Sequence, residues 1–308
     1  MKITGTAPFV LTCISAVMIA GCATRAVSLH NSKAGIRKTI SFNDNWRFDR
    51  FGIMPDGSER EEPDGLELPA FDDSDWRQLD IPHDWGIEGP FRAELPNNTG
   101  KLPWAGIGWY RKTFELPEAD SGKKIFIDFD GAMSDSTIYL NGKKVGGWPY
   151  GYASFRVDLT DAVQFGEKNV LAVRLDNKPE SSRWYPGGGI YRNVRLVKTA
   201  PVHVDHWGIT VTTPQVSASE ATVAIQTQLA GADDATEVIH EIIETGDKGS
   251  GTDTQITVSA PLLWDVETPN LYTLKTTVKQ NGKTVDTVET SFGIRTIEYH
   301  VTKGFLLN

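Results

Sequence analysis

The chain has 308 residues, of which 39% are hydrophobic and 23% are charged. This composition excludes general disorder, and the length predicts two domains. The formal net charge of −9 argues against a nucleic-acid partner, because phosphate binding needs a basic protein face.

The N-terminal segment has the pattern of a targeting signal. Lys2 supplies a positive start, and residues 7–20 form an apolar run that is short for a membrane span. Residues 19–22, Ile-Ala-Gly-Cys, resemble the lipobox of bacterial lipoproteins. We therefore predict a signal peptide with a lipobox over residues 1–22 and lipidation of Cys22. The protein would cross the bacterial inner membrane and be anchored by lipid in the outer membrane or periplasm. Ordinary secretory cleavage near Ala23 is the alternative.

Residues 23–38 are small, polar and basic, and they predict a tether between membrane and fold. From residue 39 onward, short runs of β-branched and aromatic residues alternate with Gly, Pro, Asn and Asp, and no long stretch has a helical period. This pattern predicts an all-β protein built of sandwiches. The mature domains would hold no disulfide, since Cys13 would leave with the signal peptide.

The first domain is predicted over residues 39–200 as a jelly-roll β-sandwich. Asn141-Gly142 lies between two alternating runs, which is a strong signal for a two-residue hairpin turn. In another run, Ile125, Ile127 and Phe129 fall on one face. The predicted strands are residues 108–116, 124–130, 136–140, 143–145, 154–159, 169–175 and 192–197.

The second domain is predicted over residues 201–295 as an immunoglobulin-like β-sandwich without cysteines. Residues 201–214 would carry the chain out of the first domain, and residues 279–283 contain a second Asn-Gly hairpin signal. Residues 231–235 and 246–253 have the composition of loops. The predicted strands are residues 222–229, 237–243, 254–258, 272–279 and 284–291.

Three acids, Asp72, Asp73 and Asp75, lie close together between two aromatic residues. Aspartate oxygens suit Ca²⁺, but the Gly and the distant Glu of an EF-hand are absent. The sequence favours a turn in which Asp side chains accept hydrogen bonds from backbone N–H groups while Phe71 and Trp76 pack inward.

Histidines occur beside acids at two places. His203 and Asp205 would share one face of a strand and His206 the other, so too few ligands converge for a catalytic zinc. His83 next to Asp84 favours a structural turn that could rim a site. We therefore predict no metal site, no cofactor and no catalytic residue in this chain.

Residues 182–193, SRWYPGGGIYRN, are the strongest candidate for ligand binding. Arg183, Trp184 and Tyr185 precede a rigid Pro and three glycines. Aromatic faces pack on the apolar face of a pyranose, and a guanidinium offers five donors to its hydroxyls. The segment contains no acid, so it could position a sugar but not cleave it. Core or interdomain packing of Trp184 and Tyr185 is the alternative.

Five motifs occur in a compatible order, at residues 71–76, 82–85, 108–112, 139–142 and 183–194. Together they resemble the N-terminal region of glycoside hydrolase family 2, in particular its bacterial β-galactosidase-like members. The resemblance implies a sugar-binding jelly roll, an immunoglobulin-like domain and then a (β/α)₈ barrel. The barrel would carry both glutamates of a retaining β-glycosidase, a hydrolase of O-glycosidic bonds.

The resemblance also implies that loops of the first domain shape the sugar subsite at the barrel mouth. Arg183, Trp184 and Tyr185 match one such loop best, and the loop containing Asn98 is a weaker match. The ligand would be a β-linked glycoside or oligosaccharide. The sequence does not identify the sugar or the linkage, because specificity would lie mostly in the barrel.

The chain departs from the family pattern after the second domain. Only residues 296–308 follow, whereas a barrel needs about 250 residues. We expect residues 296–308 to be a truncated start of the catalytic domain, with residues 304–308 forming a strand that lacks a partner. The chain alone would then be inactive, because its catalytic barrel in cis is missing. A standalone carbohydrate-binding surface lipoprotein without catalysis is the alternative function, and a structural, adhesin-like pair of sandwiches is a third.

Overall fold

The computed structural model describes residues 37–308. The predicted signal peptide, Cys22 and nearly all of the predicted tether therefore lie outside the described residues. Residues 37–308 contain strands and two short 3₁₀ helices but no α-helix, as the predicted all-β class requires. No helix in this part of the chain is long and apolar enough to cross a membrane.

The first domain contains eleven strands and both 3₁₀ helices. The helices are η1 (Asn97–Thr99) and η2 (Glu118–Asp120). The strands are β1 (Lys38–Ser41), β2 (Trp46–Ile53), β3 (Glu59–Arg60), β4 (Arg77–Leu79), β5 (Gly106–Glu115), β6 (Lys124–Phe129), β7 (Ser136–Leu140), β8 (Lys143–Trp148), β9 (Phe155–Asp158), β10 (Lys168–Asn177) and β11 (Val194–Thr199).

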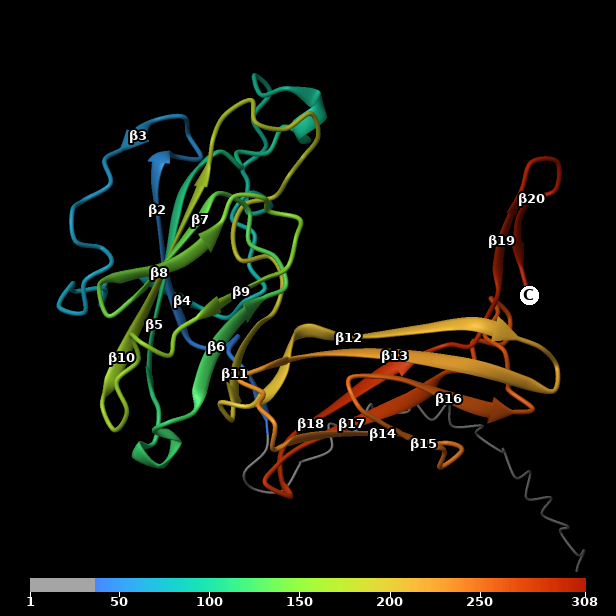
Figure 1. Ribbon diagram of the computed structural model, residues 1–308. Helices are drawn as coiled ribbons and strands as arrows, with labels where there is room; N and C mark the ends of the chain where they lie inside the picture. Colours follow the sequence, from blue (N-terminus) through green and yellow to red (C-terminus); the bar gives the residue numbers. More distant parts are fainter. Residues whose placement is uncertain (1–36) are drawn as a thin grey trace, which may run out of the picture. The chain divides into compact units, whose positions relative to one another are not determined.

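Two antiparallel sheets form the sandwich of this domain (Figure 1). One has the order β1-β11-β6-β9, and the other has the order β3-β2-β5-β10-β7-β8 with β4 paired to β2. Buried residues alternate along strands such as β2 and β7 and meet between the sheets. Ile125, Ile127 and Phe129 are all fully buried there, which confirms their predicted shared face. Burial of these side chains removes apolar surface from water and stabilises the sandwich by about 25 cal/mol per Å².

A second apolar cluster covers the outer face of the larger sheet. Phe51 and Trp109 of the sheet pack there with Trp76 from the segment between β3 and β4. The backbone N–H of Ser74 donates to Asp72 Oδ1 at 3.0 Å, and Trp76 is buried. The predicted turn is confirmed for Asp72 and for the inward packing of Phe71 and Trp76, whereas Asp73 accepts a hydrogen bond from the Arg111 side chain instead of the backbone.

Both predicted Asn-Gly hairpins are confirmed. Asn141 and Gly142 have φ values of 54° and 82° between β7 and β8. Asn281 and Gly282 have φ values of 51° and 73° in the second domain. A two-residue turn whose central residues both have positive φ matches the right-handed twist of the strands it joins, and Asn and Gly tolerate that conformation best.

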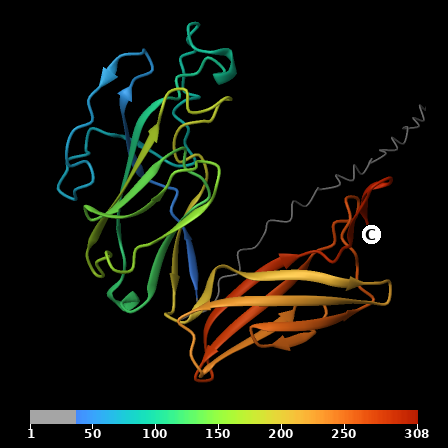
Figure 2. The ribbon, with the colours of Figure 1, turned by 45° about the horizontal axis from the view of Figure 1, so that its top comes forward.

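The second domain contains seven strands in two sheets, with the orders β12-β13-β16 and β15-β14-β17-β18 (Figure 2). Its core is formed by aliphatic and aromatic side chains that include Val223, Ile256, Leu274 and Phe292. The strands are β12 (His203–Val216), β13 (Glu220–Ala230), β14 (Thr236–Ile242), β15 (Lys248–Ser250), β16 (Asp253–Ser259), β17 (Tyr272–Gln280) and β18 (Lys283–Phe292).

Two segments of this domain differ from the prediction. Residues 201–214, predicted as a connection, lie mostly in the fourteen-residue strand β12. The register of β12 against β13 shifts between Val204 and Ile209 and again between Thr212 and Gln215. These irregularities break the two-residue alternation that identifies a strand. The predicted loop at residues 246–253 contains the three-residue strand β15, which is too short to show a pattern.

The histidine–aspartate group at the start of β12 has a structural role, as predicted. His203 is buried and its Nδ1 lies 3.1 Å from the carbonyl oxygen of Pro201. Asp205 is exposed and accepts a hydrogen bond from the backbone N–H of His206. These side chains therefore interact with the backbone of their own segment.

Residues 304–308 were expected to form a strand without a partner, and this expectation is wrong. The strand β20 (Gly304–Leu307) pairs antiparallel with β19 (Ile297–His300) in a two-stranded sheet. The partner strand precedes it in sequence and is too short and polar to stand out. Tyr299 and Phe305 pack edge to face at 5.5 Å, yet 81% and 56% of their surfaces are exposed.

The buried position of His240 predicts a pH-dependent stability for the second domain. Its ring is fully buried, with Nδ1 3.0 Å from Thr276 Oγ1 and Nε2 3.0 Å from the carbonyl oxygen of Gly251. Burial lowers the pKa of His240, although the bond to Gly251 opposes this. The folded state therefore favours the neutral ring, while the unfolded chain binds a proton near the ordinary pKa of about 6.5.

We expect the free energy of unfolding to be greatest above pH 6.5 and to fall as the pH decreases toward 5. The loss from one such group is at most about 1.4 kcal/mol per pH unit. Urea unfolding of wild type and His240→Gln at pH 7, 6 and 5 measures it, and the difference between the two proteins removes the contributions of the other histidines. Equal slopes for both proteins would disprove the assignment to His240.

Candidate functional site

Two segments far apart in sequence lie side by side at one end of the first domain. The backbone N–H of His83 donates to the carbonyl oxygen of Ile190 at 2.9 Å, and that of Trp85 donates to Gly188 at 2.8 Å. These bonds form a short ladder outside the named strands. They fix the position of the chain that leads from Arg183 into β11.

The carboxylate of Asp84 lies at the centre of this contact. Its Oδ1 accepts the backbone N–H groups of Gly86 and Gly188, both at 2.9 Å. The hydroxyl of Tyr185 donates to Oδ2 at 2.9 Å. Burial raises the pKa of Tyr185, and the charge of Asp84 raises it further, so the hydroxyl stays protonated and remains a donor. Asp84 thus fastens the turn after Tyr185 to the turn after Trp85.

The glycines of the 182–193 segment permit this close approach. A Cβ added at Gly188 would lie 2.6 Å from the indole of Trp85, and one at Gly189 would lie 2.4 Å from the carbonyl oxygen of His83. Gly189 also has a φ of 127°, which side chains other than glycine's rarely allow. Trp85 is 1% exposed and its Nε1 donates to the carbonyl oxygen of Trp104. The glycines are therefore needed for packing.

The side chain of His83, next to Asp84 in sequence, bonds other residues of the first domain. Its Nδ1 lies 2.6 Å from the hydroxyl of the buried Tyr110, and its Nε2 lies 3.0 Å from Glu88 Oε1. Arg77 also bonds Glu88. Burial lowers the pKa of His83. The predicted structural role of residues 82–85 is confirmed, since the polar side chains bond other parts of the domain, although the turn itself lies at residues 85–88.

The four residues predicted to rim a sugar site lie on two adjoining loops. Arg183 and Trp184 are exposed, and 64% of the Trp184 surface is free, with the Arg183 guanidinium 5.2 Å from its ring. Tyr185 is half-buried and its hydroxyl is bound to Asp84. Asn98 belongs to η1, and its Nδ2 donates to the carbonyl oxygen of Arg183 at 2.6 Å. We name Asn98, Arg183, Trp184 and Tyr185 the rim.

The four rim residues differ in which of their groups remain free to contact a ligand. Arg183 and Trp184 present an uncovered guanidinium beside an uncovered indole, a pair that can pack on and hydrogen bond a sugar ring. Tyr185 can offer only part of its ring, because its hydroxyl is used by Asp84. Asn98 uses its amide N–H to hold the loop. Sugar contact by these residues stays a prediction.

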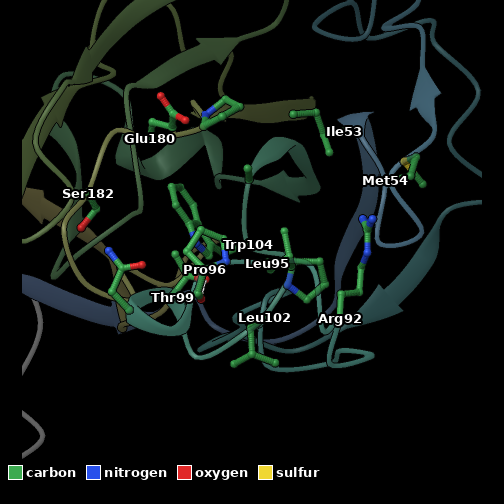
Figure 3. A pocket seen from close by; sticks show the side chains of 14 residues that line it. Ile53, Met54, Arg92, Leu95, Pro96, Thr99, Leu102, Trp104, Glu180 and Ser182 are labelled. Carbon is green, nitrogen blue, oxygen red and sulfur yellow. Dashed lines mark hydrogen bonds between the residues drawn. The ribbon is translucent and has the colours of Figure 1, made fainter.

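A pocket of about 370 Å³ lies beside the rim (Figure 3). Figure 3 shows Trp104 between Glu180 and Ser182 on one side and Met54 and Arg92 on the other. Its walls come from the end of β2, from residues 92–105 and from residues 179–182. Asn98 and Ser182 line the pocket. Their side chains also donate to the carbonyl oxygens of Arg183 and Trp184, respectively.

Among residues 37–308, no group of three or more His, Cys, Asp or Glu side chains is arranged to hold a metal ion. Asp84, the carboxylate bonded to the rim, accepts three hydrogen bonds from neighbouring groups.

Comparison with known proteins matches two family models to this chain. Residues 84–185 match the domain described as glycosyl hydrolase 2 galactose-binding domain-like, and residues 194–295 match glycosyl hydrolases family 2. Both domains of this chain belong to glycoside hydrolase family 2. The galactose-binding-like match begins at Asp84 and ends at Tyr185, the two residues whose side chains hold the turns together.

Individual family 2 proteins are similar over both domains. The chain is 44% identical over 295 residues to "Beta-galactosidase BoGH2A" of Bacteroides ovatus, covering 88% of this chain and 33% of that protein. It is 36% identical over 284 residues to a putative beta-glucuronidase of Formosa agariphila, covering 26% of that protein. The crystal structure of a beta-glycosidase from Bacteroides vulgatus superposes with a TM-score of 0.78 at 34% identity, over 88% of this chain and 35% of that one.

The chain thus spans about a quarter to a third of the length of these family 2 relatives. The matches show the family and the two sandwiches. The sequence reasoning missed the pocket beside the rim, whose apolar walls include Leu95 and Leu102. Each leucine precedes a proline. In residues 92–105, these two Leu-Pro pairs are the only local signal that the segment folds back on itself.

Asn98 is expected to hold the rim loop. Replacing Asn98 by Ala removes the bond to Arg183, and because Asn98 is exposed the loss of stability should be about 1 kcal/mol or less. The larger effect should be on the loop itself, seen as faster proteolytic cleavage and hydrogen exchange over residues 180–186. Asn97→Ala is the matched control, as its side chain is also exposed. Equal protection in the two variants would contradict this role.

Proposed function

We propose that this chain is the N-terminal, non-catalytic part of a secreted family 2 β-glycosidase of β-galactosidase-like specificity. The observation that carries the proposal is the exposed Arg183–Trp184 pair, held by Asn98 and Asp84 within a galactose-binding-like domain. The similarity to a β-galactosidase of Bacteroides ovatus across both domains supports the same activity for the protein to which this chain contributes.

In this proposal the rim binds the sugar of a β-linked glycoside or oligosaccharide, and a barrel in cis supplies the two glutamates that cleave it. Retaining hydrolysis needs two carboxyl groups about 5 Å apart. The carboxylate at the rim, Asp84, is occupied by the backbone and by Tyr185, so the chain alone is expected to position a sugar without hydrolysing it. The uncovered Tyr299 and Phe305 of the β19–β20 hairpin suit contact with such a barrel.

Hydrolysis of 4-nitrophenyl β-D-galactopyranoside and 4-nitrophenyl β-D-glucuronide tests this proposal. The complete product of the gene should release nitrophenol from the galactoside, and the 308-residue chain should release none. Turnover by the purified 308-residue chain would overturn the non-catalytic assignment. Preference of the complete product for the glucuronide would overturn the specificity.

We also propose that Cys22 is lipidated and anchors the protein in the outer membrane or periplasm. The support is the Ile-Ala-Gly-Cys pattern at residues 19–22 after an apolar run. Labelled palmitate should be incorporated into wild type and into Cys13→Ala in a bacterial host, and not into Cys22→Ala. Label in Cys22→Ala would contradict the anchor.

A further inference from the structure

The pocket beside the rim is lined mainly by apolar side chains. Nine of the fourteen lining residues are apolar, among them Ile53, Leu95, Leu102 and Trp104. Its volume of about 370 Å³ is at the lower end of the range of small-molecule pockets, roughly 300–1,000 Å³. The pocket therefore suits a compact group of one or two rings better than a long chain.

The polar side chains of the pocket are mostly committed to other parts of the protein. Arg92 Nε donates to Glu94, and Thr99 Oγ1 donates to the carbonyl oxygen of Pro96. Asn98 Nδ2 bonds Arg183, and Ser182 Oγ bonds the carbonyl oxygen of Trp184. Each of these four side chains therefore has at least one of its donors bonded within the protein, and Glu180, the fifth polar residue of the lining, carries an acceptor-only carboxylate.

With nine apolar residues and several donors already bonded, the pocket suits an apolar ring better than a sugar. A pyranose presents several hydroxyls, and each one buried without a partner costs about 1–3 kcal/mol. An apolar ring carries no such cost and gains from the removal of its surface from water. Trp104 offers it a wall that is firmly placed, since its carbonyl oxygen accepts the indole N–H of Trp85 and only 4% of its surface is exposed.

The pocket and the rim share Asn98 and adjoin at Ser182. Ser182 lines the pocket, and Arg183 follows it directly, about 3.8 Å away along the chain. Asn98 also lines the pocket while its side chain bonds Arg183. A ligand whose sugar rests on Arg183 and Trp184 can therefore place a directly attached group between residues 92–105 and 179–182.

We infer that the pocket binds the aglycone of a β-glycoside, namely a single planar aromatic ring attached to the sugar held at the rim. The inference rests on the proposed function for the sugar and adds the class of the group linked to it. The protein would then distinguish aryl β-glycosides from simple alkyl glycosides through its first domain.

Calorimetric titration of the 308-residue chain with phenyl β-D-galactopyranoside and methyl β-D-galactopyranoside tests the inference. The phenyl glycoside should bind about tenfold more tightly, because its ring leaves water. Leu102→Asp, which makes the wall polar, and Leu95→Trp, which fills the pocket, should each abolish the difference. Leu262→Asp is the matched control, since Leu262 is 64% exposed in the second domain and should leave the difference unchanged.

Circular dichroism and thermal unfolding identify any variant that fails to fold. If one pocket variant fails, the other one tests whether the pocket causes the difference in affinity. Equal binding of the two glycosides by wild type, no binding of the phenyl glycoside at millimolar concentration, or a difference that persists in both pocket variants would overturn the inference. Failure of the rim is separable, because Trp184→Ala should weaken both glycosides by the same factor if the sugar rests there.

Discussion

Replacement of Asp84 by alanine should destabilise the first domain by about 3–5 kcal/mol and release the rim loop. The carboxylate accepts the N–H groups of Gly86 and Gly188 and the hydroxyl of Tyr185. Hydrogen bonds to a charged group contribute about 1.5–3 kcal/mol each, and alanine replaces none of them. Tyr185 would also lose the partner that orients its ring.

Asp84→Asn is the control for this prediction. Asparagine keeps one carbonyl oxygen for the two backbone donors and can donate to the Tyr185 hydroxyl, so its loss should be about 1 kcal/mol. Urea unfolding followed by tryptophan fluorescence measures the stability, and hydrogen exchange at the Gly188 amide reports on the loop. Wild-type stability of Asp84→Ala would show that the contact does not support the rim.

Replacement of Arg111 by methionine should cost the first domain about 3–5 kcal/mol as well, through a different part of the fold. Arg111 is 2% exposed in β5, and its Nε donates to Asp73 at 2.7 Å. Its other nitrogens donate to the carbonyl oxygens of Leu66 and Leu68. Methionine retains the aliphatic packing but leaves two backbone carbonyl oxygens and the partly exposed Asp73 carboxylate without their donor, and each lost partner costs about 1–3 kcal/mol.

Arg47→Met provides a matched comparison on the neighbouring strand, where Arg47 pairs in register with Arg111. Arg47 is only half-buried and donates one hydrogen bond, to the carbonyl oxygen of Trp76 at 3.1 Å, so its loss should stay near 1 kcal/mol. The midpoint of urea unfolding at pH 7 measures both. Similar losses for Arg47→Met and Arg111→Met would contradict the assignment of a special anchoring role to Arg111.

The strands that could be predicted carry their signal locally. Ile125, Ile127 and Phe129 alternate without interruption, and each Asn-Gly pair names its turn type directly. The strand β12 could not be predicted because its bulges interrupt the alternation, and Trp207 within it has a φ of 53°. Where the two-residue alternation is interrupted, the sequence pattern does not distinguish a strand from a connecting segment.

The candidate site could be predicted only in part from local sequence patterns. Arg183, Trp184 and Tyr185 could be singled out from their residue types and from the family resemblance. The residues that hold these three side chains in place could not be predicted from the sequence. Tyr185 meets Asp84 across 101 residues of sequence, and Asn98 meets Arg183 across 85. Such contacts depend on the final arrangement of the loops, which no short pattern specifies.

The pocket could not be predicted for the same reason. It is assembled from three segments, and its chemical character depends on which donors are already used. Thr99 and Ser182 read as polar residues in sequence, yet in the fold their hydroxyls bond the carbonyl oxygens of Pro96 and Trp184. The hydroxyl donors of these two residues are therefore not free to bond a ligand in the pocket.

The central claim is that the exposed Arg183–Trp184 pair of the first domain holds the sugar of a β-glycoside. The kcat/KM of the complete gene product for 4-nitrophenyl β-D-galactopyranoside, measured for wild type, Trp184→Ala and Trp207→Ala, tests it most directly. Trp207 is the control, as 71% of its surface is exposed in the second domain. We predict that kcat/KM falls about tenfold in Trp184→Ala, which corresponds to about 1.4 kcal/mol of lost transition-state binding, and is unchanged in Trp207→Ala. Equal kcat/KM for wild type and Trp184→Ala would contradict the claim.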